Sequence, residues 1–182
     1  FTAGMNKRIS QDLQVNVYPL SYVKWSEFSA KDCPNVNELC WYVGEGNPLW
    51  DNRLWANAPS PSQTAVRLYK GGIWVKKLSR IAADHGKNVS DLKLAAPNGV
   101  NYLTTGNAAP VYKSNPSYGK PAYSERNDYF FLPVLGYRDG GNAYGVGGDS
   151  YFWSSTPFLL DPIYAYCLFL KPVRFEINVM RS

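Results

Sequence analysis

The sequence predicts an α+β domain made of short antiparallel strands, one or two helices and long ordered loops. Helical periodicity is confined to the middle of the chain, and runs typical of strands gather in the last third instead of alternating with helices. Of the 182 residues, 45% are apolar and 15% are aromatic, against 18% that are charged. This composition excludes a disordered chain and allows a substantial core.

The first third of the chain is predicted to hold strands and irregular segments. Residues 1–30 are interpreted as an N-terminal strand-rich arm, because apolar and polar residues alternate between Leu13 and Val17. Residues 31–182 are interpreted as the main domain. Its first part, Lys31 to Gln63, mixes tryptophans with Asn, Asp, Gly and Pro, which favours an ordered loop region anchored by large side chains.

Two helices are predicted in the middle. The clearer one lies between Gly72 and Gly86, where Gly86 is well placed to end it. A shorter helix is predicted from Ser90, a suitable N-cap, to Ala95. The residues that recur at helical spacing in the first helix are Trp74, Leu78, Ile81, Ala82 and His85.

The rest of the chain is predicted to combine long loops with strands. Gly99 to Gly148 is rich in Gly, Asn, Pro, Ser and Tyr, and is interrupted by one apolar run, Tyr129 to Leu135, typical of a buried strand. Three later runs of aromatic and branched residues are separated by prolines and predict antiparallel strands at Tyr151–Ser155, Tyr164–Leu170 and Val173–Val179. We therefore expect five to seven strands in all.

Several motifs stand in a fixed order along the chain. They are Leu132-Pro133, Gly136-Tyr137-Arg138, Val146-Gly147-Gly148, Tyr151 to Pro157, and Ala165-Tyr166 with Leu168 and Phe169. This order resembles the FISUMP-type major paralogous domain of bacterial surface proteins. Upstream, Asn37 to Val43, Asn47 to Asp51 and Leu68 to Trp74 resemble the variant found in gut Bacteroidetes. The resemblance spans Asn37 to Arg181, and Tyr151 to Pro157 is its most specific part.

The resemblance implies a C-type lectin-like fold and an extracellular protein attached to the cell surface, at the outer membrane or on a fimbrium, often as a lipoprotein. The implied role is adhesion, with a glycan or a host or bacterial surface protein as partner. Fimbrial subunits are further candidate partners, because the N-terminal arm could exchange strands with a neighbouring subunit. The start at Phe1, without an initiator Met or a leader, indicates a processed or trimmed form.

The sequence favours a non-enzymatic protein. Any Ser-His-Asp or Cys-His arrangement must use His85, the single histidine, whose apolar neighbours at helical spacing indicate a structural or capping role. An alternative stays open: a glycan hydrolase or protein-modifying enzyme on the same scaffold. Two carboxylates about 5–10 Å apart would favour hydrolysis, and the loop-rich part offers Glu125, Asp128, Asp139 and Asp149.

No cofactor or metal is expected. The three cysteines fit neither a zinc site nor a complete disulfide framework. Cys33 and Cys40 either form a small loop-closing disulfide or stay free, and Cys167 is expected to be a buried, inert thiol. Calcium-dependent sugar binding in the C-type lectin manner needs a Trp-Asn-Asp strand motif, and this chain has Trp153-Ser154-Ser155 in its place.

Recognition is therefore the favoured function. The net charge of +5 comes from scattered basic residues, so nucleic acid is not an expected partner, and no apolar run approaches the ~20 residues of a transmembrane segment. Tyrosines set among Asn, Ser, Gly and Pro are typical of adaptable binding loops, although each could instead hold its own loop. Trp153 is interpreted as a structural anchor. The predicted ligand-binding residues are Tyr118, Tyr123, Arg138, Asn142, Tyr144 and Asp149.

Overall fold

The structure is a computed structural model that describes residues 33–57, 67–105, 110, 112–134, 136–139, 142–145, 147–161 and 163–181. Within these, the side chains of 53–57, 67–70, 137–139, 142–143 and 181 are not described. The N-terminal arm predicted for residues 1–30, and with it the expected strand exchange, lies outside the described residues.

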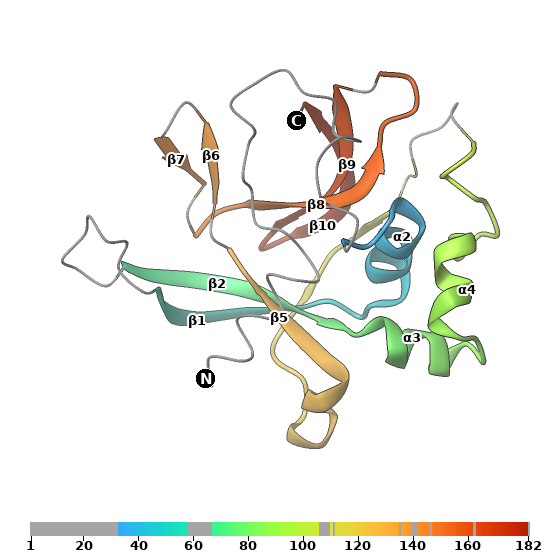
Figure 1. Ribbon diagram of the computed structural model, residues 1–182. Coiled ribbons are helices and arrows are strands. Elements are labelled where there is room, and N and C mark those ends of the chain that lie inside the picture. The colour runs from blue at the N-terminus through green and yellow to red at the C-terminus, as the bar shows by residue number, and fades with distance from the viewer. Residues whose placement is uncertain are drawn as a thin grey trace.

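Two four-stranded sheets form the framework (Figure 1). The strands of the first sheet are β1 (Leu49–Asn57), β2 (Arg67–Lys76), β4 (Ser117–Tyr118) and β5 (Tyr129–Pro133), in the order β4-β1-β2-β5. Those of the second are β3 (Lys113–Ser114), β8 (Ser150–Pro157), β9 (Tyr164–Lys171) and β10 (Arg174–Arg181), in the order β3-β10-β9-β8. A small hairpin of β6 (Tyr137–Asp139) and β7 (Asn142–Tyr144) stands apart from both.

The central element is helix α2 (Val36–Glu45), which lies between the second sheet and the short helices α3 (Leu78–Asp84) and α4 (Val89–Leu94) (Figure 1). It begins with a capping box: the Asn35 side chain accepts from the Glu38 backbone N–H, and the Glu38 carboxylate accepts from the Asn35 N–H at 2.8 Å. Eight consecutive residues of α2 are buried, so the helix is covered on all sides.

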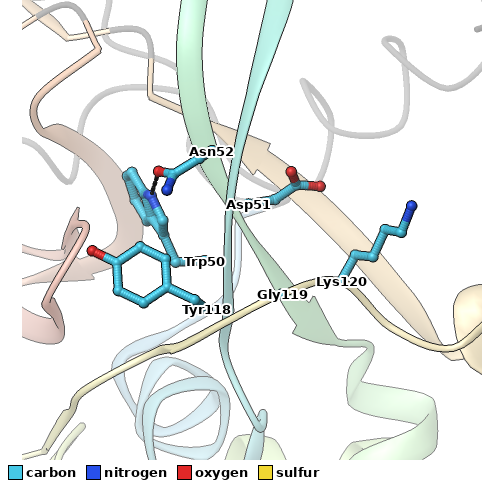
Figure 2. A pocket seen from close by; sticks show the side chains of 6 residues that line it. All are labelled: Trp50, Asp51, Asn52, Tyr118, Gly119 and Lys120. Atoms are coloured by element: carbon cyan, nitrogen blue, oxygen red, sulfur yellow. Dashed lines mark hydrogen bonds between the residues drawn. The ribbon is translucent and has the colours of Figure 1, made fainter.

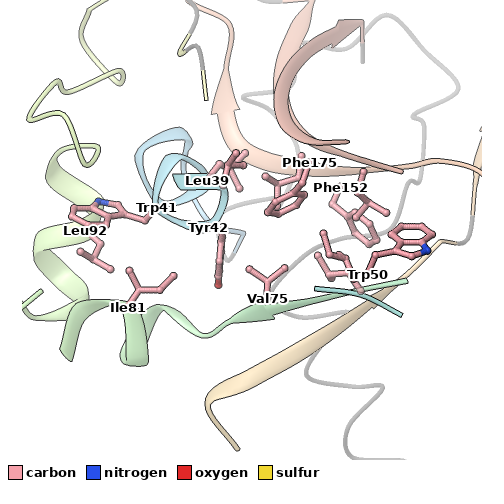
Figure 3. Packing of buried hydrophobic residues seen from close by; sticks show 14 of the residues in the cluster. Leu39, Trp41, Tyr42, Trp50, Val75, Ile81, Leu92, Phe152 and Phe175 are labelled. Carbon is pink, nitrogen blue, oxygen red and sulfur yellow. The ribbon is translucent and has the colours of Figure 1, made fainter. Parts of the chain in front are cut away.

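The main core extends from α3 and α4, past α2, to the space between the two sheets. Figure 3 shows Leu92 and Ile81 on one side of the helix, and Phe175, Phe152 and Trp50 on the other. All five of these side chains are fully buried. Burial of such large apolar surfaces is the main source of stability for the fold.

Buried polar side chains join the helices. The Asn37 amide, 0% exposed, donates to the Lys93 carbonyl at 3.0 Å and to the Asn101 side chain at 2.9 Å, and accepts from the Tyr102 N–H at 2.9 Å. Its hydrogen bonds fix α2 to the end of α4 and to the turn that follows. A buried amide that lacked such partners would be costly.

The interpretation of Trp153 as a structural anchor is confirmed. The indole is 2% exposed in a second core cluster with Cys167. The hydroxyls that follow bind main chain: Ser154 Oγ accepts from the Thr156 N–H at 3.1 Å, and Thr156 Oγ1 accepts from the Val36 N–H at 3.0 Å. Strand β8 is thereby tied to the start of α2.

Two expectations about local structure were wrong. The predicted loop region from Lys31 to Gln63 contains α2, which begins at the capping box of Asn35 and Glu38 and is buried by tertiary packing, and β1. The helix expected between Gly72 and Gly86 begins only at Leu78, since β2 continues to Lys76 and pairs with β5 up to that residue. Trp74 therefore lies on a strand, where sheet pairing overrides the helical spacing.

The remaining elements follow the prediction more closely. The α+β class is confirmed, as are the short second helix, the strand at Tyr129 and the three C-terminal strands. The described part holds ten strands and three α-helices, more than expected, because several strands are only two or three residues long. Cys33, Cys40 and Cys167 are all buried, and none of the three is in a disulfide. None of the described helices is long and apolar enough to cross a membrane.

Candidate functional site

An open pocket of about 310 Å³ lies at the edge of the first sheet (Figure 2). Three of its lining residues come from β1 and three from the end of β4 and the residues after it. They are Trp50, Asp51, Asn52, Tyr118, Gly119 and Lys120. This volume is at the lower end of the range of about 300–1,000 Å³ typical of small-ligand sites.

The backbone of the pocket is set by a short parallel pairing. Trp50 stands opposite Tyr118 in the register of β1 and β4, and the Gly119 N–H donates to the Trp50 carbonyl at 2.8 Å. Gly119 has a φ of 147°, which favours glycine, and a Cβ there would meet no atom within 4 Å. Gly119 therefore faces open space between Tyr118 and Lys120.

Trp50 forms the rigid base of the pocket. Its side chain is 1% exposed, and it lies so close to Gly71 of β2 that a Cβ there would come within 2.7 Å of the indole. The indole Nε1 donates to Asn52 Oδ1 at 2.5 Å. The two residues are two apart on one strand and so share a face, and this bond holds the Asn52 amide in one orientation.

A second tryptophan binds the acidic residue. Asp51, 6% exposed, accepts from the Trp74 indole N–H at 3.0 Å, and the Trp74 ring packs on Phe131 with centroids 5.1 Å apart. Figure 2 shows Asp51 on the side of β1 opposite to Trp50, together with the Lys120 side chain.

Tyr118 provides the accessible aromatic surface. It is 64% exposed, and its ring lies beside Trp50 in Figure 2. Asn52 and Lys120 are also exposed. The pocket thus combines an open aromatic ring with an amide and an ammonium group, which suits non-covalent binding of a small polar ligand that has an apolar face.

The structure brings one predicted binding residue, Tyr118, into this pocket. Tyr123 stands in the 3-10 helix η3 (Tyr123–Asp128), is 87% exposed, and has the Arg126 guanidinium 5.4 Å from its ring centroid. Since η3 leads directly into β5, Tyr123 precedes that strand, whereas Arg138, Asn142, Tyr144 and Asp149 follow it.

The four other predicted residues lie on or after the small hairpin. Arg138 is on β6 and Asn142 on β7, but their side chains are not described. Tyr144 ends β7 and is 45% exposed. Asp149 precedes β8, and its Oδ1 is buried and without a hydrogen bond next to Gly145, where a Cβ would overlap the carboxylate. The six residues are therefore spread over separate parts of the chain, and their role in binding stays a prediction.

Two other loop tyrosines hold their own segments. Tyr102 is buried and its hydroxyl accepts from the Asn98 side chain at 3.0 Å. The Tyr112 hydroxyl accepts from the Asn98 backbone N–H at 3.1 Å. These contacts make both residues structural.

Sequence reasoning missed most of the pocket. The sequence predicts a loop region for Trp50, Asp51 and Asn52, which lie on β1, and assigns no role to Lys120. The adjacent aromatic, acidic and amide residues were a usable signal, because strand alternation sends Trp50 and Asn52 to one face. Their partner segment around Tyr118 is 68 residues away along the chain, counted from Trp50 to Tyr118, and no sequence pattern pairs the two.

His85, Cys40 and Cys167 have structural surroundings. His85 caps the end of α3, with its Nε2 3.2 Å from Glu45 Oε2 and its ring against Trp41. Burial raises the pKa of the Cys40 thiol to about 12 and that of the Cys167 thiol further. Among the described residues, no group of three or more His, Cys, Asp or Glu side chains could hold a metal ion.

The chain matches no protein-family model, and neither the curated proteins nor the solved structures contain a significant match to it.

Proposed function

We propose that this protein is a non-enzymatic recognition module of C-type lectin-like fold, attached to the outer surface of a bacterial cell or to a fimbrium, and that it binds a saccharide in the pocket between β1 and β4. The fold and the location rest on the order of motifs from Asn37 to Arg181. Two small sheets and three short helices make an α+β domain, the general class to which that fold belongs.

The observation that carries the binding proposal is the exposed ring of Tyr118 beside the immobilised Trp50 and Asn52. A pyranose ring has an apolar C–H face that packs on an aromatic side chain, and its hydroxyls need hydrogen-bond partners at the edge. A buried tryptophan, a fixed amide and a sheet backbone keep the site preorganised, which reduces the entropic cost of binding.

The lining of the pocket supports binding over hydrolysis. Glycoside hydrolysis usually requires two carboxylates on opposite sides of the scissile bond. Of the six lining residues, Asp51 alone carries a carboxyl group, and it is buried and bonded to Trp74. A protein ligand is the rival within the binding class, and the test below separates the two.

The test is a glycan array probed with the full chain, followed by titration calorimetry with the best saccharide. We expect Tyr118→Ala to weaken binding about tenfold or more, because loss of an aromatic anchor at a binding site typically costs about 2 kcal/mol. Tyr123→Ala is the matched control, since Tyr123 is even more exposed to solvent than Tyr118, 87% against 64%, but lies outside the pocket.

The outcomes are distinct. Loss of affinity in Tyr118→Ala with wild-type affinity in Tyr123→Ala supports the proposal. Equal affinity of Tyr118→Ala and the wild type would place the site elsewhere. Binding to surface proteins stripped of glycans, with no saccharide bound, would contradict a saccharide ligand.

A further inference from the structure

We propose that the saccharide bound in this pocket carries an N-acetyl group, and that the carbonyl oxygen of this group accepts from the Asn52 amide while the sugar ring packs on Tyr118. This inference rests on the proposed function and narrows its ligand class. It follows from the side of β1 on which the pocket residues lie, and from the hydrogen-bonding atoms on that side that the protein itself already uses.

The first step concerns the side of β1 that a ligand on Tyr118 meets. Trp50 and Tyr118 are partners in the register of β1 and β4, and Asn52 follows two residues after Trp50. Figure 2 shows these three side chains on one side of β1, and those of Asp51 and Lys120 on the other. Strands lie about 4.8 Å apart and rise about 3.3 Å per residue, so the Cα atoms of Asn52 and Tyr118 are about 8 Å apart. One sugar residue with its substituents spans that distance.

The second step concerns the Asn52 amide. An indole N–H can only donate, so the amide atom that accepts from Trp50 Nε1 at 2.5 Å is the oxygen. The Nδ2 group has no acceptor among the described residues. Trp50 is 1% exposed, so a ligand cannot take its place as the partner of the oxygen. Asn52 therefore offers a ligand two N–H donors, while its oxygen is already used.

The third step concerns the ligand group that best accepts from these donors. A carboxylate needs a compensating positive charge when it leaves water, and Trp50, Asn52 and Tyr118 supply none. A sugar hydroxyl brings a donor with each acceptor atom, and on this side only the Tyr118 hydroxyl could accept from it. The carbonyl oxygen of an N-acetyl group is neutral and only accepts. Since that amide is planar and trans, its own N–H points away from Asn52 and stays in water.

The aromatic ring gives such a ligand its second contact. Tyr118 is 64% exposed, and the apolar C–H face of a sugar ring packs on its ring. The hydrogen bond to Asn52 and the packing on Tyr118 together set the position of the sugar and of its N-acetyl group. The pocket should therefore distinguish an N-acetylated sugar from the same sugar with a hydroxyl in that place.

The test uses two pairs of saccharides that differ only in the group at C2, which is N-acetyl in one member and hydroxyl in the other. They are chitotriose with cellotriose, compared by titration calorimetry, and N-acetylgalactosamine with galactose, compared by NMR titration of the full chain. We expect the N-acetylated member to bind about three- to tenfold more tightly in at least one pair, because one additional hydrogen bond contributes that much.

Two matched variants locate the effect. Asn52→Asp keeps an acceptor for the Trp50 N–H but removes the two donors, so the ratio of affinities within each pair should fall to about one. Asn127→Asp makes the same change of charge at an exposed asparagine outside the pocket, and should leave the ratio as in the wild type. Urea midpoints near that of the wild type show that both variants are folded.

The failures are distinguishable. The inference is overturned, and the proposed function left intact, if the two members of each pair bind equally, if Asn52→Asp keeps the wild-type ratio, or if every saccharide bound on the glycan array lacks an N-acetyl group. If no saccharide binds at all, both are wrong.

Discussion

Replacement of Gly71 by alanine tests the link between the core and the pocket. Gly71 on β2 has a φ of 97°, a region that residues with a Cβ rarely adopt. A Cβ there would lie 2.7 Å from Trp50 Cζ2, and Trp50 is fully buried and holds the Asn52 amide. The substitution therefore strains the backbone and displaces the indole at once.

The expected loss of stability is about 2–5 kcal/mol. A non-glycine residue in the left-handed region costs about 1–2 kcal/mol. Overpacking that forces a core side chain to move costs about 1–3 kcal/mol more. The matched control is Gly86→Ala, because Gly86 has a φ of 62° but an added Cβ there would meet nothing within 4 Å. Gly86→Ala should therefore lose only the part of the stability that comes from backbone strain, about 1–2 kcal/mol.

Urea unfolding followed by tryptophan fluorescence measures the free energy of unfolding of both variants. Calorimetry with the saccharide should also show weaker binding for Gly71→Ala, since Asn52 loses its fixed orientation. If Gly71→Ala is no less stable than Gly86→Ala, the close packing of Trp50 against β2 is not a constraint and the reasoning fails.

Three further predictions concern the helix at the centre of the fold and the thiols. Asn35→Ala removes the side-chain cap of α2 and should cost about 1 kcal/mol of unfolding free energy; an unchanged urea midpoint would contradict this. Burial raises the pKa of Glu38 above its ordinary value of 4.5, so its ionisation costs stability as pH rises from 4.5 through the raised pKa. Glu38→Gln keeps the capping acceptor, and its free energy of unfolding should exceed that of the wild type increasingly across that range of pH, but not below it. If the two free energies differ by the same amount at every pH, the raised pKa of Glu38 is not the cause. A thiol reagent should modify none of Cys33, Cys40 and Cys167 in the native protein and all three in urea, because the folded thiols are buried; rapid native labelling would show that a thiol is accessible.

Neighbouring residues in the sequence were enough to predict those helices and strands whose local residue pattern agrees with their packing in the fold. The C-terminal strands are recognisable because β-branched and aromatic residues are interrupted by prolines, and β9 is buried along six successive residues. Helix α4 was expected from the sequence, but the N-cap is Asn88, which forms a capping box with Asp91, and the predicted cap Ser90 lies inside the helix. In both cases, neighbouring residues alone carry the signal.

Other parts of the structure depend on contacts between residues that are distant in the sequence. Helix α2 is buried along eight successive residues, and its polar Asn37 finds its partners, Lys93 and Asn101, only in the folded chain. Its capping box of Asn35 and Glu38 is, in contrast, a local signal that the sequence does contain.

The pocket also depends on contacts between residues that are distant in the sequence. Trp50 and Asn52 gain their fixed arrangement from β2, and Tyr118 reaches them only through strand pairing between distant segments. A chain can display which side chains it has, but which hydrogen-bond donors remain free for a ligand depends on the contacts that folding has already made.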